Sequence, residues 1–229
     1  MLFPIRDDNP TSRRPYVTVT LIAVNVVIFL YSQTLGMRGF AYFLGEYGYT
    51  PAYFFDGGSL ITPFSSMFLH GGWMHLIGNM LFLWIFGNNI EDYFGTIKFV
   101  IFYLVSGLAA IAMYTAFNPG SQIPLVGASG AIAGVMGAYI VLHPRAEITC
   151  LLFFFFITFL TLRAKVVLGL WFLYQILMWL MSSTTGGGVA WLAHIGGFAF
   201  GWLLLRLLVR FRGGGTTPRR GQQIYRVRW

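Results

Sequence analysis

Six apolar runs, each long enough to cross a bilayer, constrain this chain more than any other feature of its sequence. The runs occupy residues 16–35, 74–90, 97–117, 127–143, 166–182 and 191–210. An α-helix needs about 20 apolar residues to cross a hydrocarbon core of about 30 Å. Only 10% of the residues are charged, whereas soluble proteins are about a quarter charged. We therefore predict an all-α, polytopic membrane protein with a bundle of six transmembrane helices.

The basic residues predict the orientation of these helices. With six spans and both termini inside, all but one of the 15 lysines and arginines fall on the inner side. The inner residues are Arg6, Arg13, Arg14, Lys98, Arg145, Arg163, Lys165, Arg206, Arg210, Arg212, Arg219, Arg220, Arg226 and Arg228. Only Arg38 falls outside, and such a bias is typical of cytoplasmic segments. This topology accounts for the net charge of +8, so the predicted partner is the lipid bilayer and not nucleic acid.

The remaining segments divide the chain into three parts. We expect a cytoplasmic N-terminal segment at 1–15, a membrane domain at 16–210, and a basic, disordered cytoplasmic tail at 211–229. The long aromatic loop at 36–72 is expected to fold on the outer surface, partly in the interface. A multi-pass protein of the cell membrane, either an inner or a plasma membrane, is the predicted localisation.

A seventh apolar run, from Ile148 to Leu162, is marginal in length and apolar all round. Periodicity therefore does not distinguish helix from strand there. A crossing would move Arg163 and Lys165 to the outside, against the charge bias. We predict a partly immersed segment that does not span the membrane.

Two polar residues lie at matched depth near the outer ends of separate apolar runs. Ser129 follows Gly127 and Ala128, and His194 stands in Ala193-His194-Ile195-Gly196-Gly197. At ~1.5 Å per residue they lie ~22 and ~24 Å above the inner boundary, roughly 6–8 Å below the outer surface. Groups that transfer protons are costly at this depth and suggest function. A serine with a histidine base is sufficient for nucleophilic catalysis, and no acidic residue of these spans lies near His194.

A second pair of polar residues could complete the site. His75 and Asn79 are four residues apart, and so share one helical face. Their N–H groups, with the backbone N–H of Ser129, are the donors that an oxyanion needs. Small residues predict close helix packing around both candidate catalytic residues. These residues are Gly127, Gly130, Gly197 and Gly201.

Each of these residues also has an ordinary structural interpretation. The serine could serve helix packing, the histidine could lie at the interface, and Asn79 could hold two helices together. His70 and His143 are assigned structural roles, and the single Cys150 is expected to be a small apolar residue. No metal or cofactor is predicted. The occurrence of Ser129, His194, His75 and Asn79 at one end of the bundle favours a catalytic site.

The sequence resembles the rhomboid intramembrane serine proteases, and most of all their bacterial members. The resemblance covers residues 12–210 and rests on three motifs. These are His75-x-x-x-Asn79, Gly127-x-Ser129-Gly130 and Ala193-His194-x-x-Gly197-x-x-x-Gly201. It implies a serine endopeptidase that cleaves transmembrane segments of membrane proteins near the outer face, where residues weaken the substrate helix. It also implies lateral access past the fifth span, which carries Trp171, Phe172 and Trp179.

Two positions depart from the pattern of this family. Some members have a tyrosine four residues after the serine, stacked on the histidine, and Ala133 stands there in this chain. Some have a Trp-Arg pair in the first loop, where this chain has only Arg38 followed by Gly39 and Phe40. The alternative function is a non-proteolytic membrane chaperone or adaptor of the same fold. A small transporter is disfavoured, because paired discontinuous helices and ionisable residues near mid-membrane are not observed.

Overall fold

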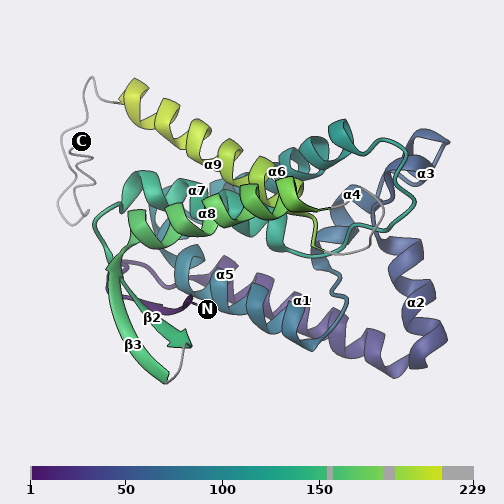
Figure 1. The fold of residues 1–229 in the computed structure, drawn as a ribbon, viewed down its shortest axis with the longest axis horizontal. Helices are drawn as coiled ribbons and strands as arrows, with labels where there is room; N and C mark the ends of the chain where they lie inside the picture. Colours follow the sequence, from purple (N-terminus) through teal and green to yellow (C-terminus); the bar gives the residue numbers. More distant parts are fainter. Residues whose placement is uncertain (1, 154–156, 183–188, 213–229) are drawn as a thin grey trace.

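A computed structural model describes residues 2–153, 157–182 and 189–212, which form a helical bundle with a small sheet at one end (Figure 1). The helices are α1 (Tyr16–Thr34), α2 (Gly36–Tyr47), α3 (Pro51–Phe55), α4 (Thr62–Ser65), α5 (Trp73–Phe94), α6 (Thr96–Phe117), α7 (Ser129–Leu142), α8 (Ala164–Met181) and α9 (Trp191–Arg212). The strands are β1 (Leu2–Asp7), β2 (Glu147–Phe153) and β3 (Ile157–Arg163). Helices α2, α3 and α4 gather at the end of the bundle opposite the sheet. The tail beyond Arg212 lies outside the described residues.

Four helices of the described chain are long and apolar enough to cross a membrane, namely α1, α6, α8 and α9. Helix α7 is apolar but has only 14 residues. Helix α5 has 22 residues, but its last turns are polar because they contain Asn88, Asn89, Glu91 and Asp92. The predicted class, a mainly helical membrane bundle, is confirmed, while the count of six spans stays a prediction.

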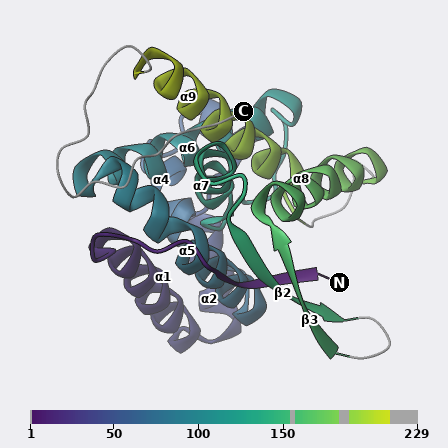
Figure 2. The same ribbon diagram turned by 90° about the vertical axis from the view of Figure 1, so that its left-hand side faces the viewer.

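Helix α7 is the centre of the bundle and packs against α5, α6 and α9 (Figure 2). All but three of its 14 residues are buried. A β-carbon placed on Gly197 of α9 would lie 2.0 Å from the carbonyl oxygen of Gly130, and one on Gly201 would lie 2.0 Å from that of Gly134. The two backbones are therefore in direct contact, which only residues without a side chain permit.

The apolar segment at 148–162 forms a β-hairpin, which the sequence did not predict. Strands β2 and β3 pair antiparallel, with Glu147 opposite Arg163 and Phe153 opposite Ile157, and β1 pairs with the other edge of β2. The segment therefore returns to the side of the bundle where it begins. Each strand has seven residues, fewer than the roughly 9–11 that a spanning strand needs. A hairpin that returns to its starting side, with strands too short to cross the membrane, is compatible with the predicted non-spanning segment.

Two carboxylates, the half-buried one of Asp7 and the buried one of Glu91, attach β1 and the start of α1 to the bundle. Asp7 of β1 accepts hydrogen bonds from the Tyr139 hydroxyl (2.9 Å) and the Asn89 side-chain amide (2.7 Å). Burial raises the pKa of the Asp7 carboxyl above its usual value, although both hydrogen bonds act in the opposite direction. The Glu91 carboxylate accepts the backbone N–H groups of Val17 and Thr18 at 2.9 and 2.8 Å. Glu91 thus satisfies free donors at the start of α1, where a negative charge is favourable.

Backbone hydrogen bonds anchor the loop at 36–72. Tyr49 and Leu125 form an isolated antiparallel bridge, with N–O distances of 3.1 and 2.7 Å. The Tyr49 hydroxyl lies 3.0 Å from the Thr115 hydroxyl of α6, and the N–H of Gly127 donates to the carbonyl of Ser66 at 2.9 Å. The loop therefore holds the chain that leads into Ser129, while Arg38 is exposed.

The glycine contact between α7 and α9 generates a stability prediction. Gly197→Ala should lower the free energy of unfolding by about 3 kcal/mol, at the upper end of overpacking effects, because the new methyl group meets backbone that cannot rotate away. Gly169→Ala is the matched control, since a β-carbon on Gly169 of α8 would meet nothing within 4 Å. Thermal unfolding in detergent micelles measures both. Equal midpoints for the two variants would show that α7 and α9 are not in backbone contact.

Candidate active site

Ser129 and His194 lie together in the folded chain, although 65 residues separate them. Ser129 is the first residue of α7, and His194 lies in the first turn of α9. The Ser129 hydroxyl oxygen lies 2.8 Å from Nε2 of His194, which is hydrogen-bonding distance. The glycine contacts between the two helices bring these helix ends close enough for this bond.

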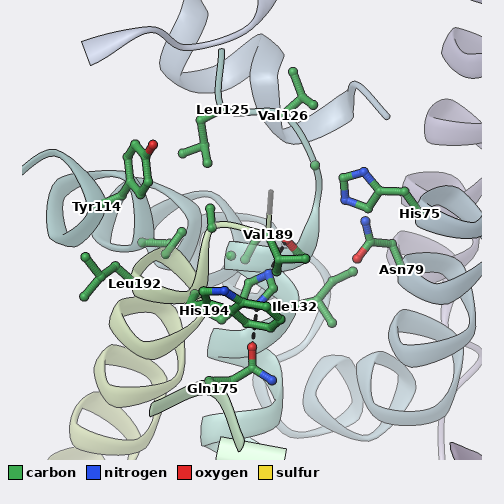
Figure 3. A pocket seen from close by; sticks show the side chains of 18 of the residues that line it. His75, Asn79, Tyr114, Leu125, Val126, Ile132, Gln175, Val189, Leu192 and His194 are labelled. Atoms are coloured by element: carbon green, nitrogen blue, oxygen red, sulfur yellow. Dashed lines mark hydrogen bonds between the residues drawn. The ribbon is translucent and has the colours of Figure 1, made fainter. Parts of the chain in front are cut away.

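A third side chain, Gln175 of α8, contacts the other ring nitrogen of the imidazole. Its Oε1 lies 2.8 Å from Nδ1 of His194, and the hydrogen bond is drawn in Figure 3. The Gln175 amide nitrogen donates to the carbonyl oxygen of Trp171 at 3.3 Å. Gln175 was not among the site residues predicted from the sequence. The signal was present, because an amide within the apolar run 166–182 needs a polar partner.

Two tryptophan rings flank His194. The Trp171 ring centroid lies 5.8 Å from that of His194 with the planes tilted by 35°, and the Trp191 ring lies edge-on at 6.3 Å. Ala133, where some rhomboids have a stacking tyrosine, is fully buried. Aromatic contact with the histidine therefore comes from α8 and α9 instead of α7.

His75 and Asn79 face the same cavity from α5 (Figure 3). Gly127 has a φ of +128°, and a β-carbon placed on it would lie 2.7 Å from Nε2 of His75 and 3.6 Å from the Ser129 hydroxyl oxygen. His75 and Ser129 therefore border one small gap. The N–H of Gly71 donates to Nδ1 of His75 at 3.4 Å, so Nε2 of the neutral ring carries its hydrogen toward that gap.

The Asn79 amide is a buried donor that points in the same direction. Asn79 is buried, and its side-chain nitrogen has no hydrogen-bond partner among the described residues. Buried polar groups without a partner are rare and call for a functional explanation. An unused amide donor in the cavity that Ser129 also lines is suited to an oxygen atom of a bound substrate.

The other two histidines lie outside this constellation. His70 is buried in the loop before α5, with its ring centroid 5.1 Å from that of His75. Burial, together with the neighbouring His75, lowers the pKa of His70 to about 3. His143 follows the last residue of α7, at the opposite end from Ser129. Within the described ranges, no three His, Cys, Asp or Glu side chains gather where a metal ion could be held.

The four predicted residues and Gln175 line one cavity of about 2100 Å³. Its walls come from α5, α6, α7, α8 and α9, from the segments 66–72 and 118–127, and from Phe3 and Pro4 of β1. Sites for small molecules usually measure about 300–1,000 Å³. This cavity is larger, so it has room for a segment of polypeptide. A serine that is hydrogen-bonded to a histidine, with N–H donors lining the same cavity, is the arrangement that serine hydrolases use.

Residues 57–211 match the Rhomboid domain family. The chain is 35% identical over 165 residues to RHOMBOID-like protein 4 of Arabidopsis thaliana, covering 69% of this chain and 36% of that protein. It is 39% identical over 88 residues to the Rhomboid protease GluP of Bacillus subtilis, covering 38% of this chain and 16% of that protein. This chain belongs to the rhomboid family, as the resemblance predicted.

The relatives are longer proteins, and one of them is named as mitochondrial. Rhomboid protein 1, mitochondrial, of Saccharomyces cerevisiae is 33% identical over 99 residues, covering 42% of this chain and 29% of that protein. The chain spans less than half the length of each of these three relatives. They come from a plant, a bacterium and a yeast, so the matches do not single out the bacterial members.

Proposed function

We propose that this chain is an intramembrane serine endopeptidase that cleaves transmembrane segments of membrane proteins near the outer face. The observation that carries the proposal is the 2.8 Å contact between Ser129 and His194 in a large cavity. Membership of the rhomboid family supports it, as does the similarity to a relative named as a protease.

The reaction uses Ser129 as nucleophile and His194 as general base. As the Ser129 oxygen attacks the scissile carbonyl carbon, Nε2 of His194 takes the hydroxyl proton. The C–N bond then breaks, and His194 returns the proton to the leaving amine. The remaining acyl-enzyme is hydrolysed by a water molecule that His194 deprotonates in the same way. No cofactor takes part in these steps.

Three N–H donors stabilise the oxyanion that forms during attack. They are Nε2–H of His75, the side-chain amide of Asn79 and the backbone N–H of Ser129. The last is free for this use because the first N–H groups of a helix have no partner within it. Donors already in place when the negative charge develops lower the barrier without reorganisation.

The substrate is a membrane-embedded segment whose helix is weakened near the outer boundary. A helical peptide uses its carbonyl groups in its own hydrogen bonds, so it must unwind before Ser129 can attack one. The size of the cavity fits an unwound segment better than a small molecule. The rim residues Trp171 and Trp179 of α8 line this space and contact His194 and Phe117 respectively.

The membrane placement follows from helix lengths and charge. Helix α7 has 14 residues and so extends only ~21 Å, less than the ~30 Å of the hydrocarbon core. If α7 ends at the inner boundary, its first residue, Ser129, lies below the outer surface. We propose six spans (α1, α5, α6, α7, α8 and α9) in a cell membrane, with both termini and the sheet on the cytoplasmic side.

Replacement of either catalytic residue tests the reaction. Ser129→Ala and His194→Ala should each abolish cleavage of a membrane-anchored reporter and labelling by a serine-reactive fluorophosphonate. The two losses should not add, since the residues act as a unit. Robust cleavage by either folded variant would exclude the dyad. A wild-type protein that neither cleaves nor labels, yet binds a transmembrane peptide, would favour the chaperone or adaptor.

The oxyanion donors should matter less than the dyad. His75→Ala and Asn79→Ala should each lower kcat by roughly 10²–10³-fold, the usual cost of one oxyanion donor. Thermal unfolding of the same variants separates this loss from a loss of fold. Ile77→Ala is a suitable control, because Ile77 lies on α5 between the two but is exposed. If both donor variants kept the wild-type kcat, His75 and Asn79 would not be oxyanion donors, and this face of α5 would serve only in packing.

The proposed topology predicts which positions face the cytoplasm. In a Cys150→Ala background, single cysteines at Glu147, Thr161, Ser59 and Ser182 would be labelled in intact cells with an impermeant thiol reagent. All four positions are exposed, and only Ser59 and Ser182 should react from outside, because the basic residues around the hairpin face the cytoplasm. Labelling at Thr161 with protection of Ser182 would show that α8 crosses the membrane in the opposite direction, which would contradict the proposal.

A further inference from the structure

Helix α8 is held to the rest of the bundle by few buried side chains, and one of them is polar. Its buried residues are Ala164, Val167, Leu168 and Gln175. The first three lie at the start of the helix, so Gln175 is the buried contact of its second half. Gln175 is only 3% exposed. Burying an amide is costly unless both its donor and its acceptor are used, and the two partners of Gln175 show how they are used.

The first partner fixes which way the amide of Gln175 faces. The carbonyl oxygen of Trp171, one turn earlier on α8, can only accept a hydrogen bond. It lies 3.3 Å from the side-chain nitrogen of Gln175, which donates to it. The amide oxygen therefore faces His194, 2.8 Å from Nδ1. Because this oxygen can only accept, Nδ1 of His194 must carry a hydrogen.

The hydrogen on Nδ1 determines whether the other ring nitrogen, Nε2, can accept a proton from the serine. A neutral histidine with its hydrogen on Nδ1 has a lone pair on Nε2. That lone pair is directed at the Ser129 hydroxyl, 2.8 Å away. With the opposite tautomer, Nε2 would carry a hydrogen and could not remove the proton of Ser129. The chain of bonds therefore selects the only neutral tautomer in which His194 acts as a base.

We propose that Gln175 is the positioning residue of this active site, and that it fixes the tautomer and the ring orientation of His194 from α8. This inference rests on the proposed function. Gln175 corresponds in position to the acidic orienting residue of a catalytic triad, but it is neutral. It holds the ring without placing a second charge at membrane depth, where a charged group is expensive.

Trp171 belongs to the same arrangement because it contacts both Gln175 and His194. Its carbonyl oxygen accepts from Gln175, and its ring lies 5.8 Å from that of His194. One turn of α8 therefore provides an acceptor for Nδ1, a support for that acceptor and an aromatic surface. A displacement of this turn would change all three contacts together.

The test compares a substitution that removes the acceptor for Nδ1 with one that keeps it. Gln175→Met keeps the length of the side chain but removes the acceptor oxygen, whereas Gln175→Glu keeps an oxygen in the same place. Leu177→Met, at an exposed position of α8, controls for changes in the helix. Reporter cleavage gives kcat and KM, and ¹H–¹⁵N correlation spectra of histidine-labelled protein report the tautomer of His194. A His194→Ala spectrum identifies its signals among those of four histidines.

Gln175→Met should lower kcat by roughly 10-fold, the equivalent of one neutral hydrogen bond, with KM unchanged and the Nδ1–H signal of His194 lost or mixed. Gln175→Glu should keep the Nδ1–H signal and recover most of kcat. Wild-type kcat and an unchanged tautomer in Gln175→Met would overturn the inference. If Gln175→Met does not fold, a folded Gln175→Glu protein without the Nδ1–H signal would overturn it equally.

The two proposals fail in distinguishable ways. If the wild-type protein shows no Ser129-dependent cleavage or labelling, the proposed function fails, but the spectra still show whether Gln175 sets the tautomer. If the wild-type protein is active and the spectra do not depend on residue 175, only the positioning role fails. Equal loss of kcat in Gln175→Met and Gln175→Glu, with the tautomer unchanged in both, would leave Gln175 a packing role alone.

Discussion

Direct backbone contact between α7 and α9 is the constraint on which the rest of the site depends. Gly197 lies against the carbonyl of Gly130, and the next glycine pair repeats the contact one turn further along. Lipid provides no hydrophobic force to drive helices together, so such association relies on close van der Waals packing. Ser129 and His194 stand at the ends of these two helices, and their 2.8 Å bond requires helices this close.

The polar groups of the site form a directional chain that carries no net charge. It runs from the Ser129 hydroxyl through His194 and Gln175 to the carbonyl of Trp171. An acidic residue in the place of Gln175 would bring a charge with a desolvation cost of several kcal/mol. A neutral amide gives the same direction without that cost. The sequence shows no acidic residue near His194 in these spans. In the described residues, the neutral amide of Gln175 occupies the place that an acid would take.

The sequence predicted the features that depend on local composition and missed those that depend on distant pairing. Apolar runs gave the long helices, and glycine spacing together with matched depth brought Ser129 to His194. The hairpin at 148–162 was not predicted as strands, because an all-apolar segment has no period and β1 lies more than 140 positions away. The loop at 36–72 is anchored by backbone atoms of Tyr49 and Leu125, which no side-chain pattern records.

In the proposed mechanism, helix α8 links access to the cavity with the chemistry inside it. Trp171, Gln175 and Trp179 all line the cavity, while Leu170, Leu173 and Leu177 are exposed on the same helix. The central helix α7, by contrast, is buried on nearly all sides. The proposed nucleophile is therefore fixed in the best-packed element, whereas the group proposed to orient its base belongs to a loosely packed one. A polypeptide that displaces α8 to reach the cavity must also move Gln175 relative to His194, so the position of α8 bears on kcat as well as on binding.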